Sequence, residues 1–81
     1  PDDAAAHYNL GVAYGNLRRH SEEIKTYNQA IRINPKYINA HFNLGLAYLK
    51  IGDIGSALQE YKILKGLDAE LANRLFNLIY P

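Results

Sequence analysis

The chain repeats itself at a fixed period, and this repeat constrains its fold more than any other feature. The stretch HYNLGVAYG, which begins at His7, returns as HFNLGLAYL at His41. A fixed period of this length is typical of repeat proteins, in which each unit buries its apolar face only against a neighbouring unit. Residues 4–37 and 38–71 are identical at Ala6/Ala40, His7/His41, Asn9/Asn43, Leu10/Leu44, Gly11/Gly45, Ala13/Ala47, Tyr14/Tyr48 and Tyr27/Tyr61.

Each unit is predicted to contain two antiparallel helices. Apolar residues recur at three- and four-residue steps through the first half of each unit, as an amphipathic helix requires. Short breaks follow at residues 18–21 and 52–56, where Ser21 and Asp53 are suited to cap the next helix. The second helix of the first unit is expected to end before Pro35, because proline disfavours helical geometry in the preceding residue.

A closing helix is predicted after the second unit, over residues 69–80. Leu71, Leu75, Leu78 and Ile79 form one apolar stripe there, and Ile79 stands where the two units have Gly11 and Gly45. Glycine costs about 1 kcal/mol inside a helix, so the two matched glycines suggest close approach of the second helix of the same unit. The sequence therefore predicts an all-α fold with helices at residues 4–17, 21–33, 38–51, 54–67 and 69–80.

These residues make the chain resemble the tetratricopeptide repeat (TPR) family. The family pattern is carried by Leu10, Gly11, Tyr14, Tyr27, Ala30 and Pro35 in the first unit, and by Leu44, Gly45, Tyr48, Gly52, Asp53, Ala57 and Tyr61 in the second. The resemblance implies a right-handed superhelix of antiparallel helix hairpins, an α-solenoid. It also implies one domain over residues 1–81, with repeats at 4–37 and 38–71 and a C-terminal closing helix at 69–80.

Two residues of the first unit depart from this pattern. Arg18 stands where the second unit has Gly52, and Glu23 stands where the family prefers a small residue and the second unit has Ala57. We expect Glu23 to lie at the periphery without a functional role; the alternative is a partly buried Glu23 with a polar partner.

Composition disfavours several classes of function. Nine basic and eight acidic residues give a net charge of +1, whereas a nucleic-acid binder usually shows a strongly basic face. The chain has no cysteine, which excludes thiol catalysis and leaves the redox compartment undetermined. No apolar run is long enough to span a membrane. Because methionine is absent even at position 1, we expect a piece excised from a longer protein, and its location in the cell is undetermined.

No enzyme, cofactor or metal site is expected. Ser21 and Ser56 lie at predicted helix starts, where capping explains them better than nucleophilic chemistry. His7 and His41 share one repeat position without a third ligand at a suitable spacing, so packing explains them better than metal binding. His20, in the first turn, is expected to face solvent.

The resemblance instead implies a partner-binding groove lined by the first helices and the closing helix. Tyr8, Phe42 and Phe76 are each one repeat period apart and are predicted to form an aromatic ladder along it; the alternative is that these rings pack between neighbouring helices. The expected groove residues are Tyr8, Val12, Asn16, Asn39, Phe42, Asn43, Leu46, Leu49, Lys50 and Phe76.

The expected partner is another protein or a peptide, and not a nucleic acid or a membrane. An apolar or amphipathic segment, extended or helical, fits these residues. Relatives that bind acidic tails use a carboxylate clamp, but at its positions only Asn43 fits and no cation is present. The alternative is a structural segment of a larger TPR array whose specificity lies elsewhere, or one that forms homo-oligomers through the groove or by end-to-end stacking.

Overall fold

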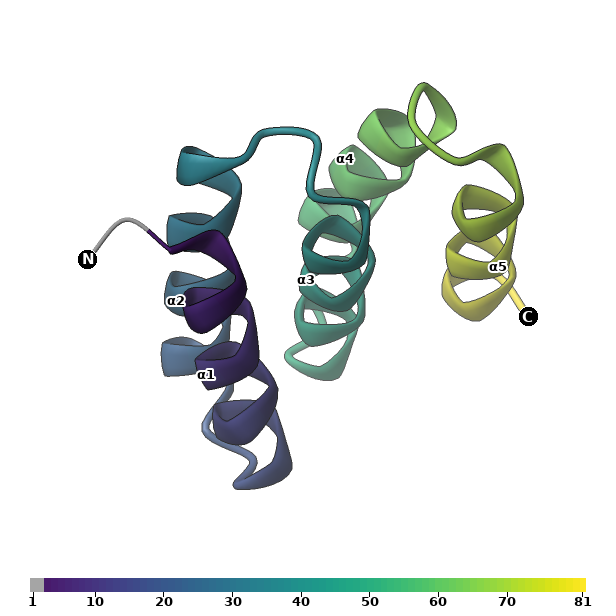
Figure 1. The fold of residues 1–81 in the computed structure, drawn as a ribbon. Helices are drawn as coiled ribbons and strands as arrows, with labels where there is room; N and C mark the ends of the chain where they lie inside the picture. Colours follow the sequence, from purple (N-terminus) through teal and green to yellow (C-terminus); the bar gives the residue numbers. More distant parts are fainter. Residues whose placement is uncertain (1–2) are drawn as a thin grey trace.

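A computed structural model describes residues 3–81 and shows five helices joined by short turns. No strand occurs in this part of the chain. In Figure 1, α1 lies in front of α2 and α3 lies in front of α4, and α5 follows at the C-terminal end. The expected helices are confirmed with ends shifted by at most two residues: α1 Ala4–Asn16, α2 His20–Ile33, α3 Ile38–Lys50, α4 Ile54–Lys65 and α5 Ala69–Ile79.

Aspartates cap three of the helices. The Oδ1 atom of Asp53 accepts a hydrogen bond from the backbone N–H of Ser56 at 3.1 Å, as expected. Asp3 and Asp68 cap α1 and α5 in the same way. The prediction that Ser21 caps α2 is wrong, because α2 begins one residue earlier, at His20, with no side-chain cap.

The two turns inside the helix hairpins share one backbone geometry. Arg18 and Gly52 have φ angles of 59° and 81°. In both turns the following N–H reaches back to the carbonyl of a tyrosine, from Arg19 to Tyr14 and from Asp53 to Tyr48, each at 2.9 Å. This is a Schellman motif, whose left-handed position favours glycine. The first turn therefore has Arg18 at a position where the backbone geometry favours glycine, and the second turn has Gly52 there.

Arg18→Gly is expected to raise the free energy of unfolding by about 1 kcal/mol, because glycine adopts the left-handed conformation without the steric cost that arginine bears. Urea denaturation measures the change. Arg19→Gly removes the same charge at a φ of −94° and should give no gain. An equal gain in both variants would contradict the backbone explanation.

The hydrophobic core runs between the hairpins and ends under α5. One cluster joins α4 and α5 through Ala57, Leu64, Ala72, Leu75 and Ile79. The side chains of Leu64 and Leu75 are 0% exposed, so α5 covers the end of the second repeat with apolar contacts. No described helix is both long and apolar enough to cross a membrane.

The two matched glycines make close contacts of different kinds. A Cβ atom at Gly11 would lie 2.5 Å from Cε1 of Tyr27, which confirms close approach of α2. A Cβ atom at Gly45 would lie 2.7 Å from Cδ2 of Leu75, while the nearest atom of α4, in Glu60, is at 3.5 Å. Gly45 therefore makes room mainly for α5, and the expectation that α4 explains it is wrong.

Gly11→Ala is expected to lower the free energy of unfolding by about 1–2 kcal/mol, because overpacking against the buried Tyr27 ring outweighs the better helix propensity of alanine. Gly45→Ala is the matched control. There the crowded atoms are terminal methyl carbons of a leucine, which can shift, so the expected change is within about 0.5 kcal/mol. Chemical denaturation of both variants checks the difference, and equal losses would contradict it.

Candidate functional site

The predicted groove residues lie on α1, α3 and α5, the helices nearest the viewer in Figure 1. None of them is fully buried. The half-buried members are Tyr8, Val12, Phe42, Asn43, Leu46 and Leu49, and the exposed members are Asn16, Asn39, Lys50 and Phe76.

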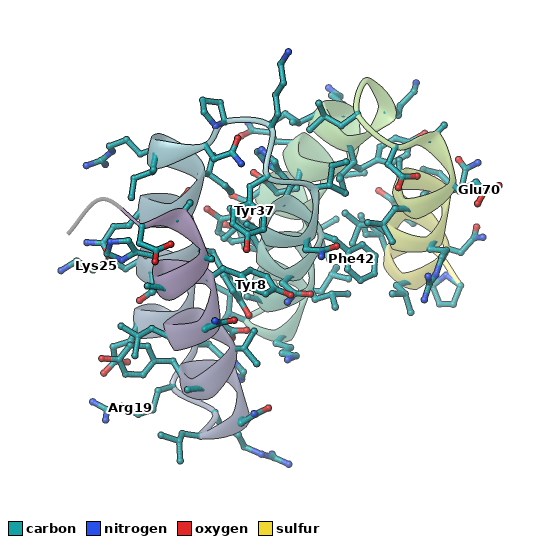
Figure 2. All side chains as sticks on the ribbon, viewed as in Figure 1. Tyr8, Arg19, Lys25, Tyr37, Phe42 and Glu70 are labelled. Carbon is teal, nitrogen blue, oxygen red and sulfur yellow. The ribbon has the colours of Figure 1, made fainter. Side chains whose placement is uncertain are left out.

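Tyr8 joins the two repeats. Its ring stacks on Tyr37 with centroids 5.2 Å apart and lies 5.8 Å from the ring of Tyr27. Its hydroxyl accepts a hydrogen bond from Nδ2 of Asn43 at 3.0 Å. Figure 2 shows the side chains of Tyr8 and Tyr37 side by side between α1 and α3. Tyr8 therefore contributes to packing between helices.

Phe42 and Phe76 also make their ring contacts with other residues. Phe42 packs against the cluster of α4 and α5, with the Arg74 guanidinium 5.9 Å from its ring centroid. The Phe76 ring lies 5.1 Å from that of Tyr61 and 5.3 Å from that of Tyr80. Among residues 3–81 no contacting ring pair joins Tyr8, Phe42 and Phe76. Their contacts agree with the alternative of packing between helices.

Asparagines occupy equivalent positions of the three helices that form this face. Asn9, Asn43 and Asn77 are each one repeat period apart, and so are Asn39 and Asn73. All except Asn43 are exposed. Each amide can both donate and accept hydrogen bonds. Asn9, Asn73 and Asn77 are not among the expected groove residues, although each lies one repeat period from Asn43 or Asn39, which are.

His41 is buried in a polar network, with only 3% of its surface exposed. Its Nε2 atom lies 2.7 Å from the carbonyl oxygen of Pro35, to which it donates, and its Nδ1 atom lies 2.7 Å from Oε1 of Glu60. The hydrogen bond to Glu60 is the main cause that raises the pKa of His41 above its usual value. The expectation of a structural histidine holds for His41. The repeat did not indicate its partner, because the first repeat has Thr26 where the second has Glu60.

His20 and Glu23 form a second pair, and both expectations for them are wrong. Glu23 is buried, with 3% exposure, instead of peripheral. Its Oε1 atom lies 2.7 Å from Nδ1 of His20, whose side chain is only 21% exposed instead of facing solvent. Gly15 creates the space, because a Cβ atom there would lie 2.5 Å from Oε2 of Glu23. The alternative of a buried Glu23 with a polar partner is therefore correct.

A cavity of about 540 Å³ lies beside this pair. Its lining comes from the end of α1, the first turn, the start of α2 and the end of α3: Gly15, Asn16, Arg18, His20 and Lys50. It includes two predicted groove residues, Asn16 and Lys50. Residues 3–81 contain no group of three side chains placed to hold a metal ion.

Comparison with known proteins identifies the repeat. A TPR repeat model matches residues 21–52, and a tetratricopeptide repeat model matches residues 38–70. No curated protein matches the chain. Repeats of this kind are generally protein-interaction modules and are typically non-catalytic. The two matched ranges and the five-helix solenoid show that the chain belongs to the tetratricopeptide repeat family.

Proposed function

We propose that the chain is a non-catalytic module that binds a segment of a partner protein on the face shared by α1, α3 and α5. One observation carries the proposal. Half-buried apolar side chains, Val12 on α1 and Leu46 on α3, occupy equivalent repeat positions beside the exposed asparagines, so the face offers apolar contact and hydrogen bonds together.

The chemistry of this face fits an amphipathic segment. Val12 and Leu46 can bury apolar side chains of the partner, which is the main favourable term in such association. The asparagine amides can pair with polar side chains or with the backbone of an extended chain. Tyr8 and Phe42 support the face from within, because their rings hold neighbouring helices together.

A double variant that changes the face but spares the packing rings tests the proposal. Peptides selected from a display library on the wild-type chain provide defined ligands. Val12→Gln combined with Leu46→Gln is expected to weaken their binding by about tenfold or more, while helicity is retained in circular dichroism. Ile33→Gln combined with Ile63→Gln is the matched control, since both residues are exposed on the second helices and should not affect binding. Equal affinity of the two double variants would contradict the proposal.

A second candidate is end-to-end association. Ala6, Leu10 and Ala13 on α1 are exposed, whereas their equivalents Ala40, Leu44 and Ala47 are at most 1% exposed. This face therefore suits another helix, and one from a second copy would give oligomers. Light scattering over a concentration series tests end-to-end association. An average molar mass that rises with concentration in the wild type and is lower in Leu10→Gln would support it. A monomer at every concentration would reject it.

A further inference from the structure

Four departures of the first repeat from the second gather around the cavity between the two hairpins. A repeat protein needs matching residues where its units pack alike, so departures at one place call for a local explanation. The pairs, first repeat before second, are Gly15 and Leu49, Arg18 and Gly52, His20 and Ile54, and Glu23 and Ala57. In each pair either an apolar side chain is lost or a charged or polar one is gained.

Gly15 lines the cavity, and its equivalent in the second repeat is a large apolar residue, Leu49. Leu49 packs against the apolar cluster of the second repeat. Gly15 has no side chain, and the Glu23 carboxylate occupies the space where its Cβ atom would lie, with Oε2 2.5 Å from that position. The cavity has a volume of about 540 Å³, and its lining includes Asn16 and Lys50, which are both exposed.

Three exposed side chains that line this cavity carry hydrogen-bond donors of positive or neutral charge. Arg18 and Lys50 bring full positive charges, and Asn16 brings an amide. Glu23 is 3% exposed and lies 2.7 Å from Nδ1 of His20, so it fixes the position of the imidazole. Within the described part of the chain, no acidic residue lines the cavity.

Arg18 is also held against its backbone preference. Its φ of 59° lies in the left-handed region, where the second repeat has Gly52. Residues held in such conformations cluster at ligand sites. A turn optimised for stability alone would carry glycine here, as the second turn does.

We propose that this cavity binds a carboxylate of the partner segment. Arg18 can bind the two carboxylate oxygens with its planar fork, and Lys50 adds a point charge. Asn16 can donate a further hydrogen bond from its side-chain amide. The proposal rests on the proposed function, because Asn16 and Lys50 belong to the proposed binding face. A protein carboxylate fits better than nucleic acid, whose binding requires neutralisation of many phosphates, because only two permanent cations from residues 3–81 line the cavity.

Nuclear magnetic resonance with small probes tests the site directly. The probes are a blocked tripeptide with a central aspartate, the same peptide with asparagine, a neutral tripeptide with an unblocked C-terminus, and inorganic phosphate. We expect the aspartate peptide or the unblocked peptide to give saturable shifts in the backbone amides of Gly15, Asn16 and Lys50; which of them binds identifies the carboxylate as a side chain or a chain end. Equal shifts with the asparagine peptide, or tighter binding of phosphate than of both carboxylate peptides, would overturn the proposal.

Variants separate this site from general charge and from the rest of the face. Arg18→Gly and Lys50→Gln are each expected to weaken binding of the carboxylate tripeptide by about threefold or more. Arg19→Gln is the matched control, because Arg19 pairs with Glu22 at 2.6 Å and lies outside the cavity lining. Equal weakening by Arg19→Gln would overturn the proposal. Val12→Gln combined with Leu46→Gln should leave tripeptide binding unchanged, so failure of this site and failure of the proposed function are distinguishable.

Discussion

Glu60→Ala is expected to lower the free energy of unfolding by about 3 kcal/mol, because it leaves the buried imidazole of His41 without its charged partner. His41 is 3% exposed, so water cannot replace the lost carboxylate without disturbing α3 and α4. Urea denaturation measures the loss. His41→Phe combined with Glu60→Leu should recover much of it, since two apolar side chains replace both polar groups. A loss as large in this double variant would contradict the ion-pair explanation.

The same pair predicts how stability changes with pH. The folded pKa of His41 is raised above the value near 6.5 expected for an unfolded chain. The pair's contribution is therefore complete below about pH 6.5 and is lost as the pH rises through the raised pKa. Urea midpoints should fall from pH 6 towards alkaline pH in the wild type, and this part of the fall should vanish in the double variant. An unchanged slope would assign the pH dependence to other groups.

Leu75→Ala is expected to lower the free energy of unfolding by about 3 kcal/mol, because it removes a fully buried side chain and leaves a cavity. Leu75 is 0% exposed and fills the space above Gly45, so the loss detaches α5 from α3 as well as from α4. Chemical denaturation measures the total, and hydrogen exchange of the α5 amides shows whether this helix opens before the rest.

Leu78→Ala is the matched control on the same helix. Leu78 is 55% exposed, so its truncation should cost no more than about 0.5 kcal/mol. Similar losses at the two positions would mean that α5 does not close the core as the structure shows. Similar hydrogen-exchange rates of the α5 amides in Leu75→Ala and Leu78→Ala would lead to the same conclusion.

Much of the fold could be predicted because repetition and helical periodicity are local signals. The match of residues 4–37 with 38–71 aligned the two hairpins, and Pro35 marked the end of α2. Asp53 could be assigned as a cap because capping depends only on residues three positions apart. The prediction of Ser21 as a cap failed although serine suits that role, because α2 begins at His20 with no side-chain cap.

The candidate site was less predictable because its properties depend on contacts between helices. Asn16, Asn39 and Lys50 are exposed, as a binding face requires, whereas Tyr8 packs against Tyr37 and Tyr27. Periodicity placed all of them on the first helices. It could not tell which side chains neighbouring helices would occupy, because that depends on the angle and distance at which the helices pack.

The sequence by itself determined that this protein is a helical repeat, because the fixed repeat period and its apolar spacing leave little choice of architecture. Only the tertiary structure decided the role of the residues that break the repeat. Glu60 on α4 pairs with His41 on α3, and Glu23 is buried because Gly15 leaves room for its carboxylate. Such pairs depend on where separate helices meet, and burial makes each polar group require the partner that packing supplies.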